Sequence, residues 1–232
     1  MNEIQMKNLI LQDSISFPDV DLKNVKAVLI DLDDTLYSYK PAHDSAIQVI
    51  HDIFLPFRKM SLQNFKKQID DVWAAIYEEM GSVPIAHNRM IVFQRLAEKN
   101  KIERPYLLAE RLYHAYFNAF FKALRQQGPA LQAKNFLKKC KKQKIPVCLV
   151  TDMQALVQTQ KLKALKLTSY VDLMVSNDEA GFDKPNPQIF LQALKKLNLK
   201  KKDVIMIGND MQRDIEGAKK LGISSYRVIV HK

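Results

Sequence analysis

The sequence predicts an α/β protein with a doubly wound, Rossmann-like core, in which a mostly parallel sheet is interrupted by an inserted α-helical domain. Three observations support this fold class. A continuous apolar run from Ala27 to Ile30 ends abruptly on the acidic stretch that begins at Asp31. Short apolar runs alternate with helical patterns beyond residue 128. Between these two parts lies a long block of strongly helical sequence.

Length and composition are those of an ordinary globular chain. The 232 residues suffice for one large domain or for a core with an inserted module. Apolar residues make up 47% and charged residues 26%, which argues against disorder. Cys140 and Cys148 fall in different predicted elements and form neither a metal motif nor a disulfide framework. Without a signal pattern or a membrane-length apolar run, we expect a cytoplasmic protein with no membrane partner.

The chain is basic, with 36 Lys and Arg against 25 Asp and Glu and a net charge of +11. This charge raises the hypothesis of a nucleic-acid-binding or scaffold protein. The lysines gather at residues 138–144 and 195–202, near the ends of predicted helices, without aromatic residues between them to stack on bases. We therefore expect solvated helix surfaces and no nucleic-acid partner. A positive field would still speed the arrival of an anionic substrate.

The first half of the chain predicts one strand and then four helices. Residues 1–24 predict a short extension on the core, to which we assign no function. The strand from Ala27 to Ile30 is apolar throughout, as expected of a parallel strand covered on both faces. After a turn-like segment at 37–41, apolar residues recur at helical spacing. These residues are Ile47, Ile50, Phe54, Phe65, Ile69, Val72 and Ile76. Further helices are predicted at about 86–98 and 106–123.

The second half predicts alternating strands and helices. Strands are expected at 147–150, 171–175, 204–207 and 227–230, with a helix at about 156–165. A further helix begins at Lys184-Pro185-Asn186-Pro187, where proline occupies a position that helices tolerate. The sequence thus predicts a split core, residues 1–40 and 127–232, around a helical cap at residues 41–126.

Asp31 and Asp33 follow the first strand, at the sheet edge where ligands of parallel sheets bind. Two carboxylates one residue apart raise each other's pKa unless a cation lies between them. Mg²⁺ is typically held by one or two carboxylates, waters and phosphate oxygens, so the pair indicates phosphoryl transfer. The alternative is a solvated acidic turn. The pattern becomes more specific because polar residues follow the later strands too: Thr151, Lys184, Asp210 and Asp214. Alone, Thr151 could cap a helix and Lys184 could be one lysine among many.

These residues resemble the haloacid dehalogenase-like hydrolases over about residues 25–230. Asp31-Leu32-Asp33-Asp34-Thr35-Leu36 matches the family's motif one, Thr151 motif two and Lys184 motif three. Gly208-Asn209-Asp210-Met211-Gln212-Arg213-Asp214 resembles motif four. The helical insertion resembles the cap that the family places between motifs one and two.

The resemblance implies a role for each matching residue. Asp31 would be the nucleophile that forms an aspartyl-phosphate, and Asp33 would be the general acid and base. Mg²⁺ would be the cofactor, held by Asp31, the backbone carbonyl of Asp33 and an acid of motif four. Thr151 and Lys184 would hold the phosphoryl oxygens.

The chain departs from the family pattern at three positions. Motif four usually continues from glycine to aspartate, whereas here Asn209 precedes Asp210; we favour Asp210 as the metal ligand because a carboxylate compensates the charge of Mg²⁺ better than an amide. Asn209 and Asp214 are then expected behind the metal ligands, with Asp214 orienting Lys184 or a bound water. Asp152 replaces a common asparagine and is a candidate substrate contact. Asp34 stands where many relatives have glycine.

The resemblance implies a Mg²⁺-dependent phosphatase acting on a small phosphorylated metabolite, either a nucleotide or a sugar phosphate. The alternatives are a 2-haloacid dehalogenase, which does not need Asp33, and a phosphomutase. The cap is expected to select the substrate, with Tyr37 and Arg89 as candidate contacts. A surface arginine is the alternative for Arg89. A monomer and a dimer both remain open.

Overall fold

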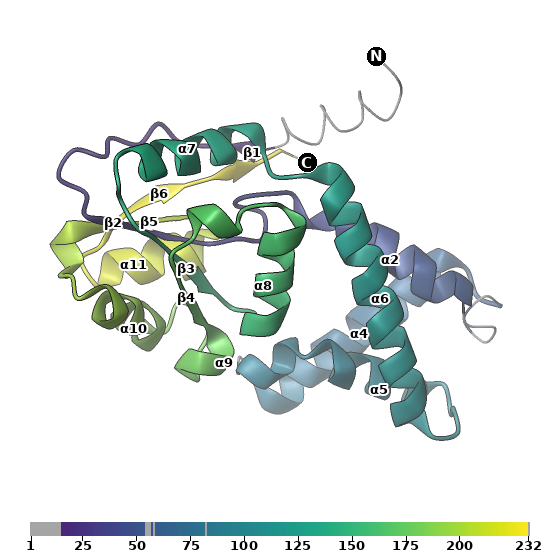
Figure 1. The fold of residues 1–232 in the computed structure, drawn as a ribbon. Helices are drawn as coiled ribbons and strands as arrows, with labels where there is room; N and C mark the ends of the chain where they lie inside the picture. Colours follow the sequence, from purple (N-terminus) through teal and green to yellow (C-terminus); the bar gives the residue numbers. More distant parts are fainter. Residues whose placement is uncertain (1–14, 54–56, 58, 82, 232) are drawn as a thin grey trace, which may run out of the picture. The chain divides into compact units, whose positions relative to one another are not determined.

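The computed structural model describes residues 15–53, 57, 59–81 and 83–231. The chain divides into two compact units (Figure 1). The core unit consists of Met1–Tyr39 and Arg125–Lys232, and the helical unit consists of Lys40–Leu124. Within the described residues, every helix is too short or too polar to cross a membrane.

The described part of the core unit contains a five-stranded sheet in which every neighbouring pair is parallel. Its strands, in spatial order, are β4 (Leu173–Ser176), β3 (Val147–Thr151), β2 (Ala27–Ile30), β5 (Val204–Gly208) and β6 (Ser224–Arg227). The central strand β2 is buried along its whole length, because helices cover both faces of the sheet. This sheet confirms the predicted doubly wound α/β fold.

Helices follow the strands of the core unit. They are α7 (Leu131–Lys142), α8 (Ala155–Ala164), α9 (Asn177–Ala180), α10 (Pro187–Leu197) and α11 (Gly217–Lys220). Side chains of α10 and α11, including Phe190 and Ala218, pack with Leu29 and Met206 of the sheet, while α7 lies on the opposite side (Figure 1). Asn186 accepts a hydrogen bond from the backbone of Gln188 and thereby caps α10.

Two of the predicted strands, at 171–175 and 227–230, differ from the observed ones. The strand predicted at 171–175 begins at Leu173, after a short 3₁₀ turn (Thr168–Tyr170). The strand predicted at 227–230 is two elements: β6 joins the sheet, whereas β7 (Ile229–Val230) pairs antiparallel with β1 (Ile15–Ser16). The edge strand β6 is partly exposed and polar, so it lacks the apolar pattern of a buried strand. Residues Ile15, Val20 and Leu22 are buried, as expected of an extension that lies on the core.

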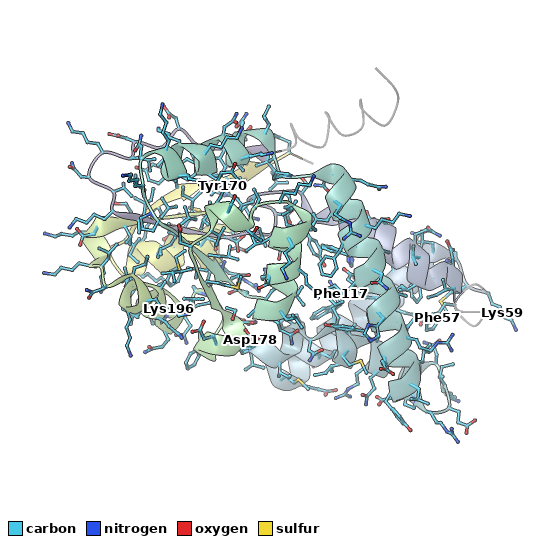
Figure 2. The ribbon with its side chains drawn as sticks, in the orientation of Figure 1. Phe57, Lys59, Phe117, Tyr170, Asp178 and Lys196 are labelled. Atoms are coloured by element: carbon cyan, nitrogen blue, oxygen red, sulfur yellow. The ribbon has the colours of Figure 1, made fainter. Side chains whose placement is uncertain are left out.

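The helical unit is built from α2 (Tyr39–Ile53), α4 (Leu62–Met80), α5 (Arg89–Lys99) and α6 (Pro105–Gln127), with a 3₁₀ turn at Pro84–His87. The predicted apolar positions are buried in α2 and α4, apart from Phe54, which lies outside the described residues. The Ser61 hydroxyl caps α4, and the helix ends at Gly81, whose positive φ of 73° favours glycine. In α6, Tyr116, Phe120 and Phe117 (labelled in Figure 2) are buried against one another, as packing residues of the helix should be.

Candidate active site

Asp31 is fixed at the carboxyl end of the central strand. Its backbone N–H donates to Ile207 O at 2.9 Å, which extends the pairing of β2 with β5 by one residue. Its Oδ2 accepts a hydrogen bond from Thr35 Oγ1 at 2.9 Å. The side chain is almost fully buried, at 7% exposure of the residue. Asp31 is therefore held in one orientation within a site from which bulk water is largely excluded.

The chain leaves β2 through a tight turn that returns Tyr37 to the site. Leu36 N–H donates to Leu32 O at 2.9 Å, which closes one helical turn. Asp34 has a φ of 58°, a left-handed conformation that aspartate tolerates better than most residues. Its Oδ1 accepts the backbone N–H of Tyr39 at 2.8 Å, which stabilises the turn further. These two features explain how aspartate replaces glycine here.

Lys184 joins motifs one, two and four. Its Nζ lies 2.8 Å from Asp31 Oδ1, 2.8 Å from Asp214 Oδ1 and 3.0 Å from Val150 O. These three acceptors match the three hydrogens of an ammonium group. Burial opposes the charge, but the two carboxylates outweigh it and raise the pKa of Lys184 well above its usual value. Lys184 is a buried cation directly beside the predicted nucleophile, and the predicted role of Asp214 in orienting Lys184 has a geometric basis.

The pKa of Asp31 is raised to about 7, mainly because burial disfavours the charged form. The carboxylates of Asp214 and Asp33 push it in the same direction, and Lys184 opposes them. The chain by itself therefore leaves negative charge at this sheet edge incompletely compensated. An additional cation would favour the ionised, nucleophilic form of Asp31.

Asp33 is held by three side chains. Lys161 Nζ lies 2.8 Å from Asp33 Oδ1 and 2.6 Å from Oδ2. Gln158 Nε2 donates to Oδ2 at 3.2 Å, and the Tyr37 hydroxyl donates to Oδ1. Burial acts to raise the pKa of Asp33, but Lys161 and the other donors lower it below its usual value. Asp33 is therefore a carboxylate at neutral pH in the free protein.

Thr151 is the last residue of β3 and lies in the site, 1% exposed. Its Oγ1 is 2.5 Å from Gln158 Nε2. The N-cap position of α8 is occupied by Gln154, so Thr151 is not the cap of this helix. Asp152 has a different surrounding: Oδ1 accepts the backbone N–H of Lys184 at 2.7 Å, and Oδ2 lies 3.4 Å from Arg213 Nη1. Both oxygens thus tie motif two to motifs three and four.

Motif four brings Asn209, rather than Asp210, close to Asp31. Thr35 Oγ1, which is bonded to Asp31, lies 3.2 Å from Asn209 Oδ1. Asp210 instead caps the following π-helical turn (Met211–Glu216), because its Oδ1 accepts the backbone N–H groups of Gln212 and Arg213 at 2.9 and 2.8 Å. The geometry therefore favours Asn209 for a metal at this edge and gives Asp210 a structural task.

The donor atoms at this edge fit a hard divalent cation. In the described part of the chain, no three His, Cys, Asp or Glu side chains gather as metal ligands. However, Asp31 Oδ2 and Asn209 Oδ1 both face the one hydroxyl proton of Thr35, so these two oxygens retain unused acceptor capacity. Carboxylate and amide oxygens are ligands that Mg²⁺ accepts.

The structure gathers most of the predicted site residues in the core unit. Asp31 is bonded to Lys184, whereas Asp33 and Thr151 share Gln158 as a partner and Tyr37 is bonded to Asp33. Arg89 belongs to the helical unit. Its guanidinium carbon lies 5.0 Å from the Trp73 ring centroid and 4.9 Å from that of Tyr116, and the residue is 9% exposed. The alternative of a surface arginine is therefore wrong, whereas contact with substrate stays a prediction.

Three site residues escaped the sequence analysis: Thr35, Gln158 and Lys161. Thr35 lies within motif one but was not singled out for its hydroxyl. Gln158 and Lys161 lie one turn apart in α8, on the face that also carries Val157 and Leu162. The sequence offers one indication of their role, namely that these two polar residues interrupt an otherwise apolar stripe of the helix.

Comparison with known proteins agrees with this geometry. The family model of the haloacid dehalogenase-like hydrolases matches residues 25–222. The chain is 28% identical to ribulose-1,5-bisphosphate 5-phosphatase from Halopiger xanaduensis, covering 86% of this chain and 82% of that protein. It is 30% identical to glyceraldehyde 3-phosphate phosphatase from Methanothermobacter thermautotrophicus, covering 88% and 85%.

A solved structure shows the same fold. The 2-haloacid dehalogenase from Pseudomonas syringae superposes with a TM-score of 0.69 at 19% identity, and the match covers 87% of this chain and 85% of that one. Because the identity is this low, the structural likeness supports the fold alone. Because the family model spans most of the chain and includes all four motifs, the protein belongs to the haloacid dehalogenase-like hydrolases.

Proposed function

We propose that this hydrolase is a phosphatase that cleaves a phosphate monoester of a small metabolite, with Asp31 as nucleophile and Asp33 as general acid and base. One observation carries the proposal: two carboxylates with one residue between them lie at the sheet edge, and each is bonded to its own buried lysine. Two separately held carboxylates suit two separate tasks, one nucleophilic and one in proton transfer.

In the first step, an Asp31 oxygen attacks phosphorus while the bond from phosphorus to the ester oxygen breaks. The ester oxygen takes the electron pair of that bond and a proton from the Asp33 carboxyl group, so an alcohol leaves. The negative charge of the bound phosphate raises the pKa of Asp33, which counteracts Lys161 and lets Asp33 carry this proton. The Lys184 ammonium and the Thr151 hydroxyl stabilise the charge on the phosphoryl oxygens.

In the second step, water attacks the phosphorus of the aspartyl-phosphate. The Asp33 carboxylate accepts a proton from this water, and the bond between phosphorus and the Asp31 oxygen breaks with its electron pair returning to Asp31. Inorganic phosphate is released and both carboxyl groups are restored. Asp33 can accept this proton because it gave up its own proton to the leaving alcohol in the first step.

A divalent cation completes the proposed site, with Mg²⁺ as the expected metal. Asp31 Oδ2, the backbone carbonyl of Asp33 and Asn209 Oδ1 would hold it, and Asn209 takes the place that the sequence suggested for Asp210. When bound, the metal supplies positive charge that compensates Asp31 and the phosphoryl oxygens.

A sugar phosphate is the substrate class that we favour over a nucleotide. Relatives that align over most of this chain are named as phosphatases of ribulose 1,5-bisphosphate, glyceraldehyde 3-phosphate and phosphorylated carbohydrates. The alternative function, a 2-haloacid dehalogenase, is disfavoured because carbon–halogen cleavage gives Asp33 no role. Three side chains nevertheless hold Asp33 in place.

The test is phosphate release from a panel of sugar phosphates, nucleotides, phosphoserine and p-nitrophenyl phosphate, with Mg²⁺ and with EDTA. We expect Mg²⁺-dependent release, highest on a sugar phosphate, and no turnover by Asp31→Asn. The same protein is assayed for halide release from 2-chloropropionate. Halide release without phosphate release would overturn the proposal in favour of a dehalogenase.

The metal ligand is tested by comparing Asn209→Ala with Asp210→Ala in Mg²⁺ titrations of phosphatase activity. We expect Asn209→Ala to raise the half-saturating Mg²⁺ concentration at least 10-fold, because it removes an oxygen beside Asp31. Asp210→Ala should remove a helix cap and lower the free energy of unfolding by on the order of 1 kcal/mol, which a lower melting temperature would show. Its effect on the half-saturating Mg²⁺ concentration should be smaller than that of Asn209→Ala. The opposite ranking would return the ligand to Asp210.

A further inference from the structure

Lys161 is a buried lysine of the core unit that belongs to none of the four motifs. It lies on α8, and its side chain is 1% exposed. A lysine ammonium is rarely buried to this degree unless an anion accompanies it. The anion is Asp33, whose two oxygens lie 2.8 and 2.6 Å from Lys161 Nζ.

The two buried lysines divide the carboxylates between them. Lys184 contacts Asp31 and Asp214, whereas Lys161 contacts Asp33. Carboxylates in a poorly solvated site repel one another strongly. Without Lys161, the Asp33 carboxylate would lose its cation and would be driven away from Asp31, towards solvent.

Neighbouring side chains also help Lys161 to orient the Asp33 carboxylate. Gln158 lies three residues before Lys161 on α8, so both side chains project from the same face. Gln158 joins Asp33 to Thr151, and the Tyr37 hydroxyl donates to the other Asp33 oxygen. The Lys161 ammonium also lies 5.5 Å from the Tyr39 ring centroid, which limits the space into which it can move. Asp33 thus has one defined orientation, and Lys161 contacts both of its oxygens.

We propose that Lys161 is a positioning residue that holds the Asp33 carboxyl group where it can pass its proton to the leaving oxygen. The proposal rests on the phosphatase function proposed above. In the step concerned, the proton moves from Asp33 to the ester oxygen as the bond from phosphorus to that oxygen breaks. Lys161 keeps its own protons and acts through Asp33, so its loss should affect most strongly those substrates that need a proton at the leaving oxygen.

The test measures kcat/KM for phosphate monoesters whose leaving groups range from an alkyl alcohol to p-nitrophenol. Since kcat/KM reports steps up to cleavage of the ester, the later hydrolysis of the aspartyl-phosphate does not obscure it. For Lys161→Met we expect a fall of about 100-fold on an alkyl phosphate, the usual scale of general-acid catalysis. On p-nitrophenyl phosphate we expect kcat/KM to fall less than 10-fold, because that leaving group needs little protonation. Lys163→Met removes the same charge from an exposed position of α8 and should change neither value.

A double variant separates positioning of Asp33 from other roles. If Lys161 acts through Asp33, then Asp33→Asn/Lys161→Met should have the same kcat/KM as Asp33→Asn. The double variant removes both members of the buried pair, so it avoids an uncompensated charge and should fold. Circular dichroism and thermal melting check that each variant is folded.

Two results would overturn the inference while leaving the phosphatase function intact. An equal fall on all esters would assign Lys161 to phosphate binding or to the fold, and an additional fall in the double variant would show that it acts independently of Asp33. Absence of phosphate release by the wild-type protein from every ester would instead overturn both proposals.

Discussion

Asp31 combines a buried position with a charge that its surroundings only partly compensate. Because the pKa of Asp31 is about 7, a substantial fraction of metal-free molecules carry a proton on this carboxyl group near neutral pH. An ionised Asp31 at higher pH is therefore a source of instability in the folded state. The proposed mechanism needs this ionised form for attack on phosphorus, so catalysis and stability would make opposite demands on Asp31.

We expect Asp31→Asn to be more stable than the wild-type protein at pH 8 in the presence of EDTA. The folded-state pKa of Asp31 is raised from 3.8 to about 7, so its ionisation above pH 7 costs the folded state on the order of a few kcal/mol. The amide avoids this cost at nearly the same volume, and Lys184 keeps Asp214 as a partner.

The gain should shrink as pH falls from 7 towards 4, because the folded wild-type protein is already protonated there while the unfolded chain takes up its proton. Thermal melts of both proteins across this range measure the difference. A variant that is less stable at pH 8 would mean that the ion pair of Asp31 with Lys184 outweighs the cost of burial.

At the scale of the element, the end of β5 and the turn after it are built around a close approach. A Cβ on Gly208 would lie 2.2 Å from Asp214 Oδ2, and that carboxylate is held by the Asp210 backbone N–H at 3.0 Å and by Lys184 at 2.8 Å. Motif four therefore requires glycine here for space, so that Asp214 can reach Lys184.

We expect Gly208→Ala to lower the free energy of unfolding by about 1–3 kcal/mol or more, as overpacking does, and to reduce phosphatase activity by displacing Asp214. Urea unfolding measures the first effect. The control is Gly222→Ala, where the added Cβ meets open space and only the left-handed φ of 79° is unfavourable. Equal losses of activity in the two variants would argue against a specific contact with Asp214.

The same elements show what the sequence could and could not predict. The positions of Asp31 and Thr151 were predictable because parallel strands bring their carboxyl ends to one edge, whereas Lys184 reaches this edge from the loop after α9. The pair of Asp33 with Lys161 joins residues 128 positions apart through a helix face, and no strand end marks it. Likewise, the split of 224–230 into β6 and β7 depends on pairing with β1, more than 200 residues away. That Asn209, and not Asp210, lies beside Thr35 could not be predicted from the motif, because both residues follow the same strand.

At the scale of the whole molecule, the two compact units are stabilised in different ways. The core unit depends on a buried sheet, whereas the helical unit packs aromatic rings around the Arg89 guanidinium. His43 accompanies this cluster through Tyr116, and its pKa falls to about 3 because of burial and the nearby Arg89. A neutral histidine and a charged arginine thus share one interior.

We expect Arg89→Ala to destabilise the helical unit by on the order of 2 kcal/mol, through loss of cation–π contacts and of packing by the arginine stem. Hydrogen exchange should accelerate in α4, α5 and α6 more than in β2, β3 and β5. Arg95→Ala is the control, since this arginine of the same helix is 41% exposed and its surface pair with Glu79 contributes little.

Activity assays then separate packing from substrate contact at Arg89. If Arg89 also contacts substrate, KM for the preferred sugar phosphate should rise while turnover of p-nitrophenyl phosphate is retained, since that ester lacks a distal polar group. Equal losses on the two substrates would limit Arg89 to packing.

The central place of β2 also determines when the site can form during synthesis. Val28 pairs with Val147 on one side and with Ile205 on the other, so the strand that leads to Asp31 has no partner in the sheet among the residues that directly follow it. A ribosome must complete the whole helical unit before the first partner strand emerges, and nearly the whole core before the second. Contacts so distant in sequence form slowly and late. Nascent chains shorter than about 210 residues should therefore lack phosphatase activity, and the exposed apolar strand would make them candidates for chaperone binding.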